Sequence, residues 1–270
     1  MDMKHCFAVC AYKESPYLTA CLTSLKEQVS PSPILVCTAT PCDSIAQAAA
    51  TFGASYHVNN AKPGISSDWN YAMQCAKDAG YDLVTLCHQD DLYLPDYGAR
   101  MKKDAERYAD LLIWFSDYGE QREYTDKPGE RVDKSRLLTI KRVLLWRMRV
   151  KAWQASRFMK HRTLAIGDPI CCPAVTFNLN KIPLPLFLDD MTTSLDWETW
   201  ERLSLMDGRF AYDPTVQMLH RIHRGSTTTA TLSAGGRVPE DYAMFRKFWP
   251  APIARVLTGW YSKSEKSNQV

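Results

Sequence analysis

The first 115 residues alternate short apolar runs with segments whose apolar residues recur at helical spacing. Leu18, Cys21, Leu22 and Leu25, for example, are spaced as one face of a helix. The runs are short enough to be strands: Cys6–Cys10, Ile34–Cys37, Ala54–Val58, Tyr81–Cys87 and Leu111–Phe115. Strands that alternate with helices predict an α/β fold, with a doubly wound, mostly parallel sheet between two layers of helices.

The segments between the runs carry helix start signals. Asp43 is expected to cap the helix Ile45–Phe52, and Ser66 or Ser67 to cap the helix that follows Gly64. In doubly wound sheets, ligands bind beyond the carboxyl ends of the strands. The polar segments that directly follow strands are therefore candidate ligand-binding loops: Ala11–Glu14, Thr38–Asp43 and His88–Asp91.

Size and composition fit one large domain. The chain has 270 residues, 46% of them hydrophobic, and a net charge of +3, which is too small to indicate a nucleic-acid-binding protein. Its nine cysteines include no Cys-x-x-Cys pair, so they are interpreted as buried apolar residues in a reducing compartment. The N-terminus does not resemble a signal peptide, and no apolar run approaches the length of a transmembrane helix. These features predict a cytoplasmic protein, with peripheral contact at the inner face of the membrane as an open alternative.

The last half of the chain is organised differently. A strand is predicted at Cys171–Phe177, a helix at Leu195–Met206 and a β-like stretch at Val216–Ile222. Residues 134–162 contain ten Lys or Arg and no Asp or Glu, and they are predicted to form one or two helices. Interleaved tryptophans would let this basic segment lie on an anionic leaflet. However, the basic residues scatter around a helical wheel, so a helix pair with solvated charges explains the segment equally well.

The motif His88-Gln89-Asp90-Asp91 places two adjacent carboxylates directly after a buried strand. They repel each other unless a cation or hydrogen-bond donors neutralise them. A hard divalent ion with oxygen ligands would do this and would also hold a diphosphate. The alternative is a turn that caps the next helix.

Two further segments combine reactive side chains. Asp196 opens an amphipathic helix that carries two tryptophans, Trp197 and Trp200, and its carboxylate could act as a general base or could only complement the helix dipole. The segment His220–Thr227 combines imidazoles, guanidiniums and hydroxyls around Gly225, which suits a diphosphate and a metal ion, or a solvated basic loop. The motifs of dinucleotide binding, P-loop phosphoryl transfer and serine hydrolysis do not occur.

Taken together and in this order, the motifs resemble the family 2 glycosyltransferases with a GT-A fold, of the type that builds bacterial surface polysaccharides. The resemblance covers roughly residues 4–230. It rests on Cys10–Glu14 with the helix that follows, and on His88–Asp91 with Tyr93-Leu94-Pro95. It rests also on three later segments: Phe187–Asp190, Leu195–Trp200 and Arg221–Ser226.

The resemblance implies roles for individual residues. Asp90 would coordinate Mg²⁺ or Mn²⁺ at the donor diphosphate, with Asp91 and His223 as further metal contacts. His88 stands where relatives carry the first acidic residue of the motif. Asp196 would be the catalytic base. Two groups of residues would contact the substrates. On the donor side these are Ala11, Tyr12, Glu14, Thr38, Asp43, Asp68 and Trp69 with Asp90 and Asp91, and on the acceptor side Asp168, Asp189 and Trp197.

The predicted activity is metal-dependent, inverting transfer of a hexosyl group from a nucleotide-sugar, UDP-sugar by default, to a hydroxyl of a lipid-linked or surface glycan. Residues 1–125 would form the Rossmann-like nucleotide half, residues 126–235 the acceptor half with its helical additions, and residues 236–270 a tail. Two other functions remain open. A sugar nucleotidyltransferase would release pyrophosphate, and a non-catalytic, membrane-associated subunit that binds glycans or sugar nucleotides would show no turnover.

Overall fold

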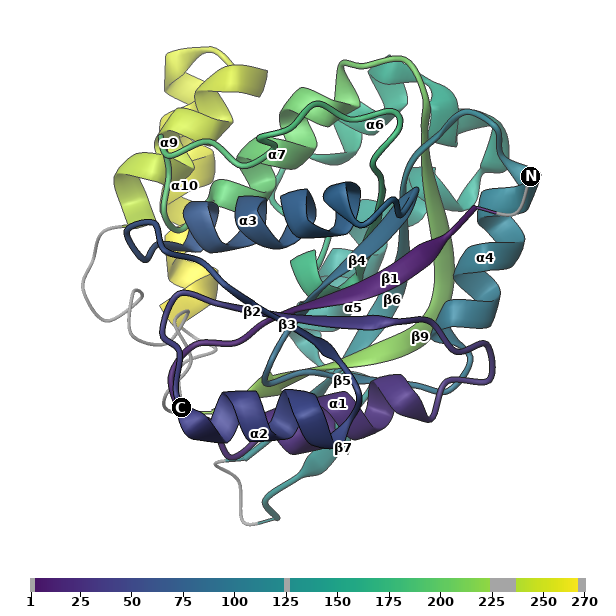
Figure 1. Cartoon of the computed structure of the whole chain (residues 1–270). Helices are drawn as coiled ribbons and strands as arrows, with labels where there is room; N and C mark the ends of the chain where they lie inside the picture. The colour runs from purple at the N-terminus through teal and green to yellow at the C-terminus, as the bar shows by residue number, and fades with distance from the viewer. Residues whose placement is uncertain (1–2, 124–126, 224–236, 267–270) are drawn as a thin grey trace.

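A computed structural model of the chain describes residues 3–123, 127–223 and 237–266, with side chains as far as Ser262. Nine strands form one mixed sheet, in the order β3-β2-β1-β4-β8-β6-β9-β5, and β7 pairs with β6 (Figure 1). The strands are β1 His5–Cys10, β2 Ile34–Thr38, β3 Ser55–Val58, β4 Leu83–His88, β5 Leu92–Tyr93, β6 Leu111–Arg122, β7 Glu130–Val132, β8 Val175–Asn178 and β9 Arg209–Ile222.

The helices cover both faces of this sheet. In chain order they are α1 Leu18–Lys26, α2 Asp43–Thr51, α3 Ile65–Asp78, α4 Tyr97–Arg107, α5 Arg136–Leu144, α6 Arg157–Thr163, α7 Leu195–Ser204, α9 Arg237–Phe248 and α10 Ala251–Lys266. Short 3₁₀ helices lie at Leu145–Arg149 (η1), Lys151–Ala155 (η2) and Cys172–Ala174 (η3). No described helix is long and apolar enough to cross a membrane.

The prediction of an α/β fold with a mostly parallel sheet is confirmed. Strands β1 to β4 are mutually parallel, and β9 runs parallel to β6, whereas β8 is antiparallel to both of its neighbours, β4 and β6. Because β8 reverses direction between them, β6 and β9 run the same way as β1 to β4. The carboxyl ends of β1, β4 and β9 therefore meet at one edge of the sheet, which is the edge predicted to bind ligands.

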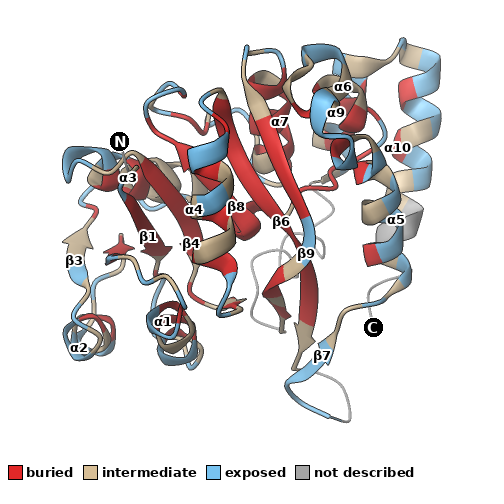
Figure 2. Ribbon diagram, turned by 90° about the vertical axis from the view of Figure 1, so that its right-hand side faces the viewer, coloured by how far each residue is buried: buried red, intermediate tan, exposed pale blue. Residues whose placement is uncertain are grey.

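Two apolar layers hold the helices on the sheet (Figure 2). On one face, α3, α7 and α9 bury residues such as Met73, Trp200 and Phe245. On the other, α1, α2 and α4 bury Leu22, Ile45 and Met101. The strands between the layers are almost fully buried, which explains why their sequences are continuous apolar runs and do not alternate.

Several predicted boundaries differ from the structure. Helix α2 begins at Asp43 after Cys42, and α3 begins at Ile65 after Gly64, so neither Asp43 nor the two serines are caps. The predicted strand Cys171–Phe177 starts as the 3₁₀ turn η3 and becomes strand only at Val175. Strand β6 extends to Arg122 because its second half pairs with β9. The long C-terminal helices α9 and α10 occupy most of the segment predicted as a tail.

Candidate active site

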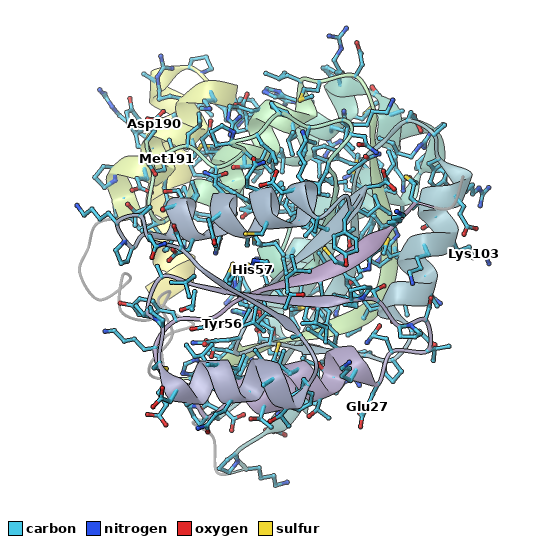
Figure 3. All side chains as sticks on the ribbon, in the orientation of Figure 1. Glu27, Tyr56, His57, Lys103, Asp190 and Met191 are labelled. Atoms are coloured by element: carbon cyan, nitrogen blue, oxygen red, sulfur yellow. The ribbon has the colours of Figure 1, made fainter. Side chains whose placement is uncertain are left out.

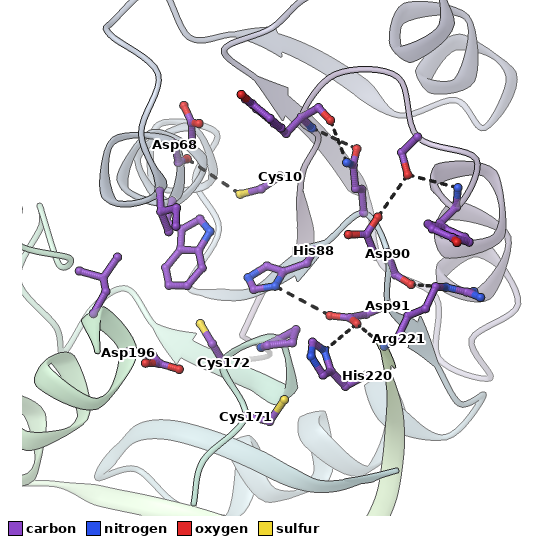
Figure 4. Close-up of a pocket in the computed structure, with 18 of the residues that line it drawn as sticks. Cys10, Asp68, His88, Asp90, Asp91, Cys171, Cys172, Asp196, His220 and Arg221 are labelled. Carbon is purple, nitrogen blue, oxygen red and sulfur yellow. Dashed lines mark hydrogen bonds and ion pairs between the residues drawn. The ribbon is translucent and has the colours of Figure 1, made fainter. Parts of the chain in front are cut away.

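A cavity of about 930 Å³ lies at the carboxyl edge of the sheet. Its walls come from the loop after β1, the start of α3, the turn after β4, the start of α7 and the end of β9 (Figure 4). The cavity therefore joins three sequence motifs that are far apart in the chain: Ala11–Glu14, His88–Asp91 and the segment from His220 to His223.

The turn after β4 is fixed by pairing on both sides. Cys10 of β1 lies opposite His88 of β4, and β5 pairs antiparallel with β9, which brings the two aspartates against the end of β9. The amide of Gln89 donates to Tyr12 O (2.9 Å) and accepts from Tyr12 N (3.0 Å). This double hydrogen bond holds the loop after β1 against the turn, so the two segments form one wall of the cavity.

The two aspartates differ in environment. Asp91 is buried, and its Oδ1 accepts hydrogen bonds from Arg221 N (2.9 Å) and from His220 Nδ1 (3.0 Å). Burial alone would raise the pKa of Asp91, but the His220 imidazole and these hydrogen bonds outweigh it and hold the pKa below its usual value. Burial would likewise lower the pKa of His220, and the Asp91 carboxylate raises it. Asp91 thus connects the ends of β4 and β9.

Asp90 is partly exposed and faces the cavity. Its carboxylate accepts a hydrogen bond from Ser15 Oγ (3.2 Å) and lies 3.2 Å from His223 Nε2. Arg221 Nε donates to the backbone carbonyl of Asp90 (2.7 Å), which fixes the direction of the turn. The His223 ring also packs against Tyr17, with 4.8 Å between ring centroids. A carboxylate and an imidazole therefore meet at the cavity wall.

His88 and Trp69 form a stacked pair beside the aspartates. Their ring centroids are 5.0 Å apart and their planes differ by 24°. Burial lowers the pKa of His88, so the ring is neutral near neutral pH. One face of the Trp69 ring is used for this stack and Phe187 packs edge-on against the ring, so a nucleobase would have to use the remaining surface.

Asp68 contributes a further carboxylate from the first turn of α3. Its Oδ1 accepts a hydrogen bond from Asn59 Nδ2 (2.9 Å), and burial raises its pKa from the ordinary value. Tyr12, Glu14 and Trp69 line the same cavity. The predicted nucleotide contacts from the loop after β1 and from α3 are therefore brought together.

The proposed base lies on the far side of the cavity from Asp90 (Figure 4). Asp196 is in the first turn of α7, where its Oδ1 accepts a hydrogen bond from Trp197 N (2.9 Å). Asp168 lies next to it and is buried; burial and then the Asp196 carboxylate raise the pKa of Asp168 well above its usual value. Burial and the neighbouring Asp196 carboxylate thus both disfavour the charged form of Asp168.

Four predicted contacts do not line the cavity. Thr38 is buried at the end of β2, and its Oγ1 accepts from Thr40 N; Asp43 is exposed at the start of α2. Asp189 is exposed and accepts a hydrogen bond from Ser66 of α3. Trp197 lies in the core, where it packs against Phe245 and donates to Leu164 O (3.1 Å). The indole of Trp197 therefore supports α7 from behind and does not face the acceptor side of the cavity, because helical rotation turns it away from Asp196.

The structure adds residues that the sequence motifs did not reveal. Lys141 of α5, Arg237 of α9 and Tyr261 of α10 line the cavity, as do Cys171 and Cys172. The basic and aromatic character of these segments is visible in the sequence, but nothing in it shows which residues point inward. The predicted contacts of Arg224, Gly225, Ser226 and Thr227 lie outside the described residues.

The side chains at the cavity wall supply some, but not all, of the ligands that a divalent cation needs. Among the described residues, no group of three His, Cys, Asp or Glu side chains is arranged to hold a metal ion alone. Asp90 and His223 supply one carboxylate and one imidazole, a combination that Mn²⁺ and Mg²⁺ accept alongside phosphate and water oxygens. A cation bound here would complete its coordination with ligands from the substrate.

A doubly wound sheet with acidic and imidazole side chains at its carboxyl edge is the architecture of GT-A glycosyltransferases. The chain matches glycosyl transferase family 2 over residues 6–178. It belongs to this family and is a glycosyltransferase. No curated protein sequence is significantly similar to it.

Solved glycosyltransferase structures share the fold. The mannosyltransferase PcManGT from Pyrobaculum calidifontis, in complex with GDP-Man and Mn²⁺, superposes with a TM-score of 0.64 at 15% identity, over 97% of this chain and 70% of that one. S. aureus TarS 1–349 in complex with UDP-GlcNAc gives 0.56 at 15% identity, over 95% and 70%. Glucosyl-3-phosphoglycerate synthase from Mycobacterium tuberculosis, with Mn²⁺, UDP and glucosyl-3-phosphoglycerate, gives 0.53 at 13% identity, over 82% and 73%. At these identities the likeness concerns the fold.

Proposed function

We propose that the chain transfers a hexosyl group from a nucleotide-sugar to a hydroxyl group, with inversion at the anomeric carbon and with Mg²⁺ or Mn²⁺ as cofactor. One observation carries the proposal. A carboxylate at the start of α7, Asp196, faces the pair Asp90 and His223 across a single cavity (Figure 4). A direct displacement needs these two functions on opposite sides of the reacting carbon, because the acceptor attacks from the side opposite the leaving diphosphate.

The donor would bind between the loop after β1 and the start of α3. The Tyr12 ring is exposed on the cavity wall with the Lys13 ammonium 5.0 Å from its centroid, and Asp68 offers an acceptor to a base or ribose. Two of the structural neighbours are complexes with UDP or UDP-GlcNAc and one is a complex with GDP-Man. We take UDP as the default nucleotide for this chain.

The leaving diphosphate would lie against Asp90, His223 and the buried Arg221. The cation would neutralise the charge that develops on the leaving phosphate. The residues of the chain do the positioning: Asp91 and His220 hold the two strand ends in register, and Arg221 sets the direction of the Asp90 carbonyl. Asp91 would act on the cation through this framework or through its second carboxylate oxygen, which has no hydrogen-bond partner in the described part of the chain.

Asp196 would take the proton of the acceptor hydroxyl as its oxygen attacks. Asp168, buried beside Asp196, would help to fix the orientation of the base. We propose a glycan acceptor, lipid-linked or at a growing surface polymer, on the side lined by Asp168 and Lys141, with Asp189 at the outer rim. In this assignment residues 1–125 bind mainly the nucleotide, and residues from 126 onward bind mainly the acceptor.

The experiment is a thermal-shift screen of nucleotide-sugars with and without Mn²⁺, followed by a transfer or hydrolysis assay with those that bind. A donor at 100 times its dissociation constant should stabilise the fold by about 2.7 kcal/mol. Metal-dependent stabilisation and release of nucleoside diphosphate support the proposal. Pyrophosphate release from a nucleoside triphosphate would instead establish a nucleotidyltransferase, and binding without turnover would establish a non-catalytic subunit.

A further inference from the structure

Two helices from distant parts of the chain, α5 and α10, both line the cavity and both reach Gly167. In Figure 2, α5 and α10 lie along the same side of the molecule. Their contact is close at Gly167, where an added methyl group would lie 3.0 Å from the Tyr261 ring and 3.8 Å from the Leu144 side chain. Helices α5 and α10 therefore form one continuous wall.

In each of these helices one residue faces the cavity, and the residue directly before it is exposed to solvent. On α5, Lys141 lines the cavity and Ile140 is exposed. On α10, Tyr261 lines the cavity and Trp260 is exposed. The outer surface of the wall thus adjoins the acceptor side of the site.

Large apolar side chains are exposed on both helices and beside Gly167. Trp260 is 69% exposed, Val143 is 61% exposed and Trp146 is 46% exposed. Exposed side chains of this kind do not contribute burial energy to folding. A group of exposed aromatic and aliphatic side chains is uncommon on the surface of a soluble protein. We define the α5–α10 face by six exposed residues: Ile140, Val143, Trp146, Ile166, Val256 and Trp260.

The chain segments that supply these residues carry only positive charges. Residues 134–167 and 242–264, which supply the whole α5–α10 face, contain no Asp or Glu. Arg136, Arg149 and Arg255 are exposed around it. A protein partner would usually offer charges of both signs, whereas a lipid surface offers a continuous negative potential above an apolar interior.

We propose that the α5–α10 face docks on an anionic lipid bilayer. The tryptophans and aliphatic side chains would enter the headgroup region, and the arginines would lie at the level of the phosphates. The docking itself does not depend on the proposed function, but its consequence for catalysis does. The acceptor side of the cavity would open beside the bilayer, where a lipid-linked glycan could reach Asp196 while its lipid stays inserted.

The test is co-sedimentation of the full-length chain with vesicles of phosphatidylcholine, with and without phosphatidylglycerol. We expect binding to the phosphatidylglycerol vesicles, release by high salt and a blue shift of tryptophan emission that Trp260→Ser reduces. Since one basic residue near such a surface is equivalent to about fivefold in partitioning, Arg149→Glu and Arg255→Glu should each weaken binding by at least about that factor.

Lys103→Glu is the matched control. It makes the same change in net charge on α4, whose Lys103 points outward well away from α10 (Figure 3). The inference is overturned if the chain does not bind phosphatidylglycerol vesicles at low salt, or if Lys103→Glu weakens binding as much as Arg149→Glu. It is also overturned if sedimentation shows a dimer that Trp260→Ser dissociates, since the face would then bind a second copy of the chain. The assay needs no sugar donor, so its result is independent of the transferase assay.

Discussion

Asp91 accepts a hydrogen bond from His220 Nδ1 at 3.0 Å, and this contact joins the end of β4 to the end of β9. Its neighbour Asp90 points the other way, into the cavity, where it meets His223. The two adjacent carboxylates therefore have different surroundings, and we expect Asp91 to hold the framework and Asp90 to bind the cation. The first prediction separates them.

Asp91→Ala should destabilise the fold by about 2–4 kcal/mol, because it removes a buried carboxylate and leaves the partly buried His220 imidazole and the buried Arg221 N–H without their acceptor. Asp90→Ala should cost less than about 1 kcal/mol, since its side chain is partly exposed, but should abolish Mn²⁺-dependent binding of UDP or of the donor. Urea denaturation and calorimetric titration measure the two effects. If the Asp90→Ala variant bound nucleotide and metal as well as the wild type does, the metal assignment would be wrong.

Asp196→Asn should reduce turnover by at least about 100-fold and leave donor affinity within about twofold, because the amide keeps the shape of the side chain but accepts no proton. The measurement is the kcat and KM of transfer, with donor binding followed separately. Asp207→Asn is the matched control, since Asp207 is exposed and its partner is Arg157 on the surface. Near wild-type turnover of the Asp196→Asn enzyme would contradict the assignment of the base.

Glu240 of α9 fixes the segment before α7. Its carboxylate accepts hydrogen bonds from three consecutive backbone N–H groups, those of Thr192, Thr193 and Ser194, at 2.8–3.0 Å. These bonds lower the pKa of Glu240 against the effect of its partial burial. Glu240→Ala should cost about 1–2 kcal/mol of stability and lower kcat with little change in donor KM, because the start of α7 carries Asp196.

Arg246→Ala, on the same helix and exposed, is the control for this variant. Glu240→Gln should recover part of the activity, since its amide oxygen can still accept two of the bonds. A loss of donor affinity equal to the loss of kcat would show that Glu240 acts on the whole site and not through α7.

The buried carboxyl group of Asp241 should make the free energy of unfolding depend on pH. It is fully buried, and burial raises its pKa to about 6, with partial compensation from Arg237 and Ser194. Between about pH 4 and 6 the folded chain therefore holds a proton that the unfolded chain has released. Because of this difference, Asp241 lowers the free energy of unfolding as pH rises, and the effect is complete above about pH 6. The total is about 3 kcal/mol.

Asp241→Asn should remove this loss, and its stability relative to the wild type should increase from about pH 4 to about pH 6 and then stay constant. Urea denaturation across this range gives the difference, with the exposed Asp190→Asn as the control (Figure 3). A difference that is flat with pH would show that Asp241 titrates normally.

The positions of Asp43 and Asp68 predict which of the two carboxylates contacts the nucleotide. Asp68 lines the cavity and Asp43 does not. Asp68→Asn should weaken binding of UDP or of the donor by about 10-fold, as expected for one charged hydrogen bond, and Asp43→Asn should leave it unchanged. A loss of affinity with Asp43→Asn and none with Asp68→Asn would place the nucleotide beside β2 and not beside α3.

The sequence by itself determined the elements of the nucleotide half and the edge of the sheet where chemistry occurs. Apolar runs separated by helical segments specify parallel strands locally, and residues directly after such strands must lie at one edge. For this reason the loops that contain Tyr12 and Asp90 could be assigned to a common edge from their positions in the chain, whereas His223 was assigned by the family resemblance. The resemblance of the ordered motifs then added Asp196, and the family membership is confirmed.

Only the tertiary structure decided which of these residues face the cavity. Pairing of β5 with β9 buries Asp91 and leaves Asp90 partly exposed, although the two are neighbours in the sequence. Packing of α9 and α10 against α7 buries Trp197 and brings Arg237 and Tyr261 to the site. Such contacts join segments far apart in the chain, and their free energy depends on complementary shape and burial on both sides, which no local pattern of residues records.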